Sequence, residues 1–325
     1  MKRSILVLLT IFFTVAINAT LINAKTLKLS GNNPPNSPTS LAEKNFCDLV
    51  EKYTGGEVEV KHYPGGQLGS ASSQIESVQT GALDMSVLAG GWAGRVIKEF
   101  NAAYMPYVFE NFQQFKKFLN SSLFKEWNEK MAKEKNMRML TPWLRAPRAV
   151  FSKKPLFNIN DFQGLKMRVW NVPAFVKGFK AMGTNPTRIG WGEVYLALKQ
   201  GVVDACESTL DNYYPKKFQE VAPYIIDLNF GYGFWTVFVN EAKYQKFSPN
   251  LRNAILKASA ETADYYAGIL ETSLKNNIEQ CMKEGTVIIK IYQKPFIDKA
   301  KTVIMELDGD AWPKGSYEKV RNAVQ

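Results

Sequence analysis

Histidine and cysteine, the side chains on which most metal sites and nucleophilic active sites depend, are scarce in this sequence. It has one histidine, His62, and three cysteines among 325 residues. A Ser–His or Cys–His pair requires a histidine beside its nucleophile, and a histidine-rich metal site requires several of them. We therefore expect no catalytic residue, no metal site and no cofactor.

The sequence also lacks an apolar run long enough to cross a membrane. Its N-terminal run, residues 5–17, follows Lys2 and Arg3 and falls short of the roughly 20 residues that a spanning helix needs. Small residues follow at Ala19 and Ala24, a pattern typical of a signal peptide. We predict a signal peptide over residues 1–24 and a periplasmic location for the mature protein. A retained membrane anchor is the alternative.

Blocks of like charge are absent as well. The net charge is +11, but lysines and arginines are scattered among acidic residues, which disfavours binding to nucleic acid. The hydrophobic content of 46% and the charged content of 22% are those of a globular protein large enough for two lobes. Cys47, Cys206 and Cys281 could form at most one disulfide, and we expect three buried free thiols.

What is present is an alternation of strand and helix patterns in two blocks. The first block has expected strands at 26–30, 57–63 and 84–88 and helices at 40–53 and 72–80. The second has strands at 149–152, 165–170, 187–189 and 203–206 and helices at 173–182 and 192–199, before a strand at 234–240 returns to the first block. This order predicts mainly parallel sheets flanked by helices, with a chain that crosses between lobes more than once.

A long helical pattern follows over residues 248–284, closed by Gly285. A helix of that length would extend for about 50 Å at 1.5 Å per residue, which is more than the width of one small domain. It could therefore brace both lobes. The alternative is two ordinary helices with a break between them.

Two segments resemble a known family. The first contains TGGEVEV at 54–60, YPGGQLG at 63–69 and VQTGALDM at 78–85. The second contains GLKMRV at 164–169, GTNPT at 183–187 and WGEVYLALKQGVVD at 191–204. Their order and spacing, over about residues 25–210, are similar to those of the substrate-binding proteins of TRAP (tripartite ATP-independent periplasmic) transporters, the DctP family.

The resemblance implies a two-lobed α/β periplasmic-binding-protein (Venus flytrap) fold with a long helix spanning both lobes. We expect lobe I to comprise residues 25–147 plus about 233–270, and lobe II residues 148–232 plus about 271–325. Such a protein, expected to be a monomer, captures a small organic acid by lobe closure and delivers it to TRAP membrane permease subunits. The alternatives are a module that reports to a sensor kinase and, less favoured, an exported hydrolase or lyase.

In this family the arginine of the Arg-Val motif, here Arg168, forms a two-pronged salt bridge with the ligand carboxylate. A guanidinium offers paired coplanar donors that match both oxygens of a carboxylate, and it stays charged at any working pH. Arg168 also stands at the end of an expected strand, and ligands of open α/β sheets bind beyond the carboxyl ends of strands. A structural ion pair is the alternative role for this residue.

The resemblance suggests further ligand-binding residues. Arg148 occupies the place of a second ligand-contacting arginine in many family members, although the neighbouring Arg145 could take that role. Two arginines facing one site favour an anion over a neutral sugar, because they repel each other unless negative charge lies between them. Where many relatives have a ligand-contacting asparagine, this chain has Ser208, and the preceding Glu207 has an ambiguous role.

Aromatic side chains are expected around the same cleft. Trp191 and Trp92 are the favoured apolar walls, which would exclude water from the bound anion. Asn33, in the first strand-to-helix loop, is a weaker candidate for a polar contact from the N-terminal lobe. The loop 89–92 lacks the charged residues seen in the sialic-acid-binding branch, which counts against that ligand.

Overall fold

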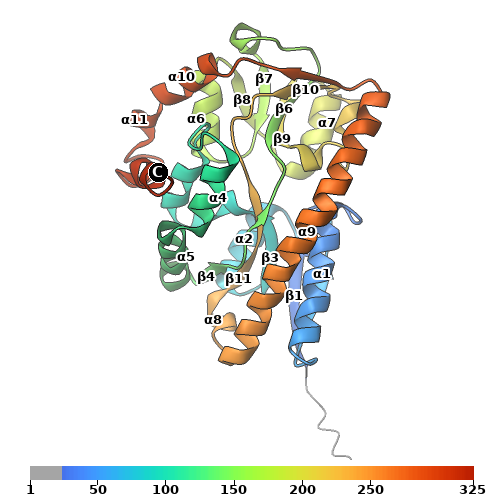
Figure 1. Cartoon of the computed structure of the whole chain (residues 1–325), viewed down its shortest axis with the longest axis vertical. Helices are drawn as coiled ribbons and strands as arrows, with labels where there is room; N and C mark the ends of the chain where they lie inside the picture. Colours follow the sequence, from blue (N-terminus) through green and yellow to red (C-terminus); the bar gives the residue numbers. More distant parts are fainter. Residues whose placement is uncertain (1–23) are drawn as a thin grey trace, which may run out of the picture.

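The computed structural model describes residues 24–325, so the predicted signal peptide lies, except for Ala24, outside the described residues. The strands form two six-stranded sheets that lie one above the other along the long axis of the molecule, with helices on their faces (Figure 1). Within residues 24–325, none of the helices combines the length and the apolar run that a membrane crossing requires. Cys47, Cys206 and Cys281 are buried free thiols.

The first sheet contains the N-terminal strands. Its order is β2 (Val58–Tyr63), β1 (Lys25–Gly31), β3 (Met85–Ala89), β11 (Phe234–Asn240) and β4 (Met137–Met139), and β5 (Trp143–Leu144) also pairs with β11. Strand β1 runs parallel to β2 and β3, whereas β11 runs antiparallel to its partners β3, β4 and β5.

The second sheet carries most of the middle of the chain. Its order is β12 (Val287–Lys290), β10 (Tyr224–Asp227), β6 (Arg148–Ser152), β9 (Ala205–Thr209), β7 (Lys166–Val169) and β8 (Asn185–Arg188). Strand β7 is parallel to β8 and β9, and β10 is parallel to β12, but β6 is antiparallel to both of its neighbours. In each sheet five of the six strands run in the same direction and one, β11 or β6, runs against them, so the expectation of mainly parallel sheets is confirmed. Strands β6 and β11 enter by crossing from the other sheet, and each pairs antiparallel with its neighbours.

Helices flank both sheets and extend to the C-terminus. They are α1 (Pro38–Tyr53), α2 (Ala71–Thr80), α3 (Ala93–Val96), α4 (Phe112–Asn120), α5 (Ser122–Lys135), α6 (Pro173–Ala181), α7 (Val194–Lys199), α8 (Glu241–Tyr244), α9 (Pro249–Lys283), α10 (Lys294–Thr302), α11 (Ile304–Leu307) and α12 (Ser316–Asn322). Short 3₁₀ helices lie at Gly90–Trp92, Lys98–Tyr104, Ile159–Phe162, Trp191–Glu193, Leu210–Asn212 and Phe218–Glu220.

Helix α9 is one continuous helix of 35 residues, so the alternative of two helices with a break is wrong. Ser248 caps its N-terminus by accepting a hydrogen bond from the backbone N–H of Leu251, and Gly285 follows its end with φ of 98°. Ile255 and Tyr266, in the first half of α9, belong to the hydrophobic core that packs against the first sheet. Its last turn contributes Cys281 to the core under the second sheet, and Figure 1 shows the helix running alongside both sheets.

The C-terminal residues pack against the segment that follows β3. Asn101 Nδ2 donates to the carbonyl oxygens of both Gly94 and Ala311, and Arg321 Nη1 donates to the carbonyl oxygen of Val108 at 2.7 Å. Helix α10 packs instead against α6, beside the second sheet. The last helices thus contact both halves of the molecule, and the division of the chain into lobes I and II stays a prediction.

Candidate functional site

A pocket of about 630 Å³ lies between the two sheets. Its walls come from segments far apart in the chain. They include Leu88, Ala89 and Trp92 at the end of β3 and just beyond it, and Arg168, Arg188 and Ser208 from strands of the second sheet. The pocket lies at the carboxyl end of β3 in the first sheet and at the carboxyl ends of β7 and β8 in the second. Open α/β sheets bind their ligands beyond these ends of their strands.

Arginine dominates the charge of this pocket. Five arginines line it, and its lining, drawn from residues 24–325, contains neither Asp nor Glu. Three of the five side chains, Arg145, Arg148 and Arg168, are only 5% to 6% exposed. Arg95 and Arg188 are exposed to solvent although they line the same pocket, and we call the part that they line its mouth.

Glu207 on β9 is buried behind two of these arginines. Its carboxylate accepts from Arg148 Nη2, from Arg168 Nη1 at 3.4 Å and from the backbone N–H of Trp170 at 3.2 Å. Arg168 Nε also donates to the carbonyl oxygen of Ile189 at 3.1 Å. Glu207 is fully buried and does not line the pocket, so it positions guanidinium groups and does not form part of the wall.

One carboxylate shared by two guanidinium groups leaves positive charge uncompensated. Burial lowers the pKa of Arg168, an effect that Arg148 reinforces and that Glu207 opposes. Burial therefore destabilises the charged form of this side chain in the empty pocket. An anion that enters the pocket would remove that cost, because it would supply the missing negative charge at short range.

Arg145 and Arg148 both reach the pocket, so the structure does not favour one over the other as the second ligand-contacting arginine. Arg145 donates to Asp211 Oδ2 from Nη2 at 3.1 Å and from Nε at 3.2 Å, and to the hydroxyl of Thr209. Its guanidinium lies 3.9 Å from the centre of the Trp235 ring. This ion pair leaves Arg145 better compensated than Arg148 and Arg168, which share one carboxylate.

The other residues expected at the site divide into two groups. Ser208, Trp191 and Trp92 line the pocket, and Arg168 lies 5.5 Å from the centre of the Trp191 ring. Asn33 is buried and is absent from the wall, where Asn32 stands in its place. Both residues lie in the loop after β1, where a shift of one residue moves the side chain from the wall of the cleft into the interior.

The two walls touch at Trp170, which follows β7. Its ring meets Trp92 edge-on at 6.5 Å between centroids and packs between Tyr104 and Phe175. Gly91 leaves the space that this ring occupies, because a Cβ at position 91 would overlap the Trp170 ring. The absence of a side chain at Gly91 therefore permits this close approach of the two sheets.

Two pocket arginines were not expected from the sequence. Arg188 ends β8, beside β7, so the strand-end rule that selects Arg168 would have selected it too. Arg95 lies in α3, and no motif in the sequence marks it. Among residues 24–325, no group of three or more His, Cys, Asp and Glu side chains could hold a metal ion.

Comparison with known proteins places this arrangement in a family context. The model of the bacterial extracellular solute-binding proteins of family 7 (DctP) matches residues 29–308. The C4-dicarboxylate-binding periplasmic protein DctP of Rhodobacter capsulatus is 30% identical over 263 residues, which cover 80% of this chain and 78% of that protein. The sialic acid-binding periplasmic protein SiaP of Vibrio cholerae is 27% identical over 303 residues, 93% of each chain.

Solved structures share the fold. A TRAP periplasmic solute-binding protein from Pseudomonas putida F1 with bound D-glucuronate has a TM-score of 0.86 at 24% identity, over 92% of this chain and 96% of that one. The sugar acid binding protein DctPAm from Advenella mimigardefordensis, in complex with galactonate, has a TM-score of 0.86 at 21% identity, over 93% and 98%. The expected two-lobed α/β fold with a long helix is thereby confirmed.

Proposed function

This chain belongs to the bacterial extracellular solute-binding proteins of family 7, the DctP family, and from that premise we propose how it works. It captures a small organic acid in the pocket between its two sheets and delivers the acid to the membrane subunits of a TRAP transporter. It acts in the periplasm as a binding protein, without catalysis, after removal of residues 1–24. The C4-dicarboxylates, D-glucuronate and galactonate named for its relatives are all carboxylates, which supports this choice of ligand.

The observation that carries the proposal is the set of arginines in a pocket whose lining has no acidic side chain. A neutral ligand would leave these guanidinium groups unpaired, whereas a carboxylate accepts two parallel hydrogen bonds from one of them. Arg168 is the residue that we propose for this paired contact. Arg148 forms an ion pair with the same buried carboxylate as Arg168, that of Glu207. The Nε of Arg148 has no hydrogen-bond partner among residues 24–325.

The same geometry suggests how capture is coupled to closure. A ligand that contacts Arg168 on the second sheet and Trp92 after the first sheet gains both interactions only when the two sheets are close together. Such a ligand stabilises the closed state, and that state is the form that the membrane subunits would recognise. Trp92 and Trp191 shield the pocket from water, which strengthens the ion pair inside it.

A thermal-shift experiment with matched acids and amides tests the proposal. Benzoate with benzamide, and succinate with succinamide, differ in charge and hardly in shape. A bound acid at a hundred times its dissociation constant would add about 2.7 kcal/mol to the unfolding free energy, and its amide would add far less. Equal stabilisation by acids and amides, or by neither, would contradict capture of a carboxylate.

Delivery needs a separate measurement. We expect the ligand-loaded protein to co-purify with TRAP membrane subunits when both are expressed in the same cells. Co-purification with a sensor kinase in place of those subunits would support a reporting role and contradict the transport role, while leaving carboxylate capture intact.

A further inference from the structure

The five pocket arginines form two groups, which we call the inner and the outer arginines. The inner arginines are Arg145, Arg148 and Arg168, which are buried and paired with Glu207 or Asp211. The outer arginines are Arg95 on α3 and Arg188 at the end of β8, so each side of the cleft contributes one of them.

The outer arginines have little negative charge near them. Arg95 donates to the hydroxyl of Ser72 at 2.9 Å, and its one carboxylate neighbour, the exposed Glu76, lies 3.9 Å away. The salt bridges of the pocket arginines involve the other four, which leaves Arg188 without a carboxylate partner among residues 24–325. The mouth of the pocket thus carries two cations, one from each side of the cleft, with little negative charge to compensate them.

The wall around these groups is apolar. Trp92 and Leu88 belong to the side of the first sheet, and Ile189 and Trp191 to the side of the second. An arginine lies over each of these two indole rings, Arg95 at 5.6 Å from the centre of Trp92 and Arg168 at 5.5 Å from the centre of Trp191. A flat or extended hydrocarbon body would fit between such walls.

Several polar side chains of the pocket already have one partner each, whereas the ring N–H groups of Trp170, Trp191 and Trp235 have none among residues 24–325. Asn32 Oδ1 accepts from Gln74, Ser70 Oγ caps α2, and Ser72 Oγ accepts from Arg95. Ser208 Oγ accepts from Asn212 Nδ2 at 3.1 Å. It is therefore the apolar wall that disfavours a polyol, because along Leu88, Trp92 and Ile189 a sugar acid would bury hydroxyl groups without a partner.

We infer that the ligand is a diacid with an apolar or aromatic body, held at one end by the inner arginines and at the other by Arg95 and Arg188. The inference rests on the proposed function, because the first carboxylate is the one that Arg168 binds there. The second carboxylate, at the mouth, is the addition. A pocket of about 630 Å³ is of the size that holds small-molecule ligands of this kind.

Isothermal titration calorimetry with matched ligands tests the second carboxylate. Terephthalate is compared with benzoate, and adipate with hexanoate, since each pair differs chiefly by one carboxylate. Galactonate represents the sugar acids. We expect at least one diacid to bind more tightly than its monoacid by about tenfold or more, which corresponds to about 1.4 kcal/mol. Galactonate is expected to bind more weakly than that diacid.

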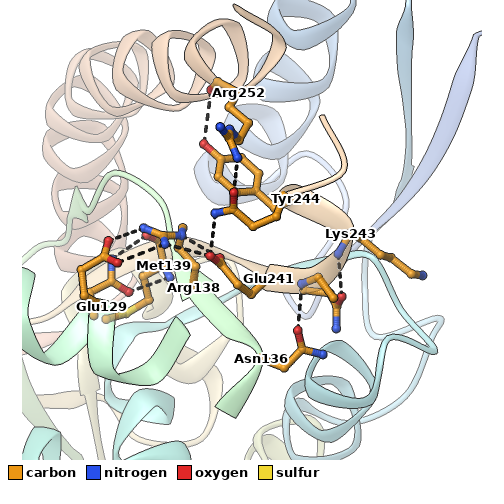
Figure 2. A network of polar contacts seen from close by, with 12 residues as sticks. Glu129, Asn136, Arg138, Met139, Glu241, Lys243, Tyr244 and Arg252 are labelled. Carbon is orange, nitrogen blue, oxygen red and sulfur yellow. Dashed lines mark hydrogen bonds and ion pairs between the residues drawn. The ribbon is translucent and has the colours of Figure 1, made fainter. Parts of the chain in front are cut away.

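Variants then identify the residue responsible. Arg188→Gln is expected to weaken binding of the diacid by about tenfold or more and binding of the monoacid much less, which removes the preference for the diacid. Arg252→Gln is the matched control, because it removes the same charge from α9 beside Tyr244, away from the pocket lining (Figure 2). This control is expected to change neither affinity.

Each contrary result has a distinct meaning. Equal binding of diacids and monoacids, or tighter binding of galactonate, would overturn the diacid inference while the proposed capture of a carboxylate stands. A uniform loss for all acids in Arg188→Gln would show that Arg188 acts through net charge alone, which also overturns it. Failure of every acid to bind the unaltered protein would refute the proposed function itself.

Discussion

Arginine serves two different purposes in two regions of this molecule. Far from the pocket, Arg138 on β4 lies between two carboxylates, as Figure 2 shows. It donates to Glu241 from Nε at 2.7 Å and from Nη2 at 2.9 Å, and to Glu129 from Nη1 at 2.6 Å. The hydrogen bonds with Glu241 raise the pKa of Arg138 above its usual value, although partial burial opposes them.

In the pocket the imbalance is the opposite one, because arginines outnumber carboxylates. Three buried guanidinium groups there share two buried carboxylates, Glu207 and Asp211. The pKa of Arg168 is lowered by burial, whereas that of Arg138 is raised. An arginine with two carboxylates holds structure together. A cluster with fewer carboxylates than arginines keeps positive charge that an anion can neutralise. The ratio of carboxylates to arginines therefore distinguishes a structural cluster from a binding cluster.

The largest expected effect comes from removing negative charge in the pocket. Glu207→Gln would leave Arg148 and Arg168 buried without a carboxylate, so we expect the unfolding free energy of the ligand-free protein to fall by about 3–5 kcal/mol. Urea denaturation measures this loss. A bound acid should recover more stability in the variant than in the unaltered protein, because it replaces the missing charge.

Glu129→Gln is the control for that experiment. Glu129 is half exposed, and Arg138 keeps its other partner Glu241, so we expect a loss below about 1 kcal/mol. Equal losses in the two variants would mean that the ratio of charges does not distinguish the two regions.

The next effect concerns affinity. Arg168→Ala is expected to weaken binding of the acid at least about a hundredfold, equivalent to about 2.7 kcal/mol, because it removes a charge-assisted paired contact. Arg138→Ala should lower stability and leave affinity unchanged. Calorimetric titration of both variants provides the comparison, and unchanged affinity in Arg168→Ala would remove Arg168 from the site.

A smaller effect on affinity is expected from the contact between the two walls. Gly91→Ala would place a methyl group against the Trp170 ring, which Tyr104 and Phe175 hold in place. The two sheets would then be pushed apart, so we expect about a tenfold loss of affinity, within the range for overpacked sites. Titration of the variant with the same acid measures it.

Gly192→Ala serves as the matched control for Gly91→Ala. Gly192 also lines the pocket, but a Cβ there meets nothing within 4 Å. Its affinity should stay within about twofold of the unaltered protein, since open space accepts a methyl group without strain. A similar loss in both variants would show that closure does not depend on the contact between Gly91 and Trp170.

Local signals in the sequence predicted the elements that they marked to within about two residues at most ends, but they marked none of the helices and strands over residues 93–144 and 287–322. Strand β11 has the expected bounds, and α9 extends from the Ser248 cap to the turn at Gly285, because caps and glycine turns act over a few residues. The sequence did not predict that β6 and β11 run antiparallel to their neighbours. Strand β11 pairs with β3, some 145 residues earlier in the chain, and no local pattern specifies the direction of such a contact.

The site was predictable where residues follow strand ends or match the family motifs. Arg168, Arg148, Ser208, Trp191 and Trp92 all line one pocket, although their contact with a ligand stays a proposal. Asn33 was placed one residue away from the wall position, since the sequence does not show which side of a loop faces the cleft. The sequence also did not show that Glu207 joins two arginines, because that contact depends on how three strands pair.

The smallest expected effect is a dependence of stability on pH in the Arg138 cluster. Burial acts to raise the pKa of Glu241, but hydrogen bonds from Arg138 and Gln245 outweigh it and hold the pKa below the usual value of 4.5. A carboxyl whose pKa is lower in the folded than in the unfolded state stabilises the protein fully above the unfolded value. That stabilisation is lost as the pH falls from about 4.5 through the folded pKa.

Glu241→Gln should therefore be less stable than the unaltered protein at neutral pH, and the difference should shrink below pH 4.5. Urea denaturation at several pH values measures it. The loss should be smaller than that in Arg138→Ala, because Glu129 still holds the guanidinium. Affinity for the acid at neutral pH should stay unchanged. A difference that stays constant with pH would mean that Arg138 and Glu241 do not depend on each other's charge, and the contrast with the pocket would then rest on burial alone.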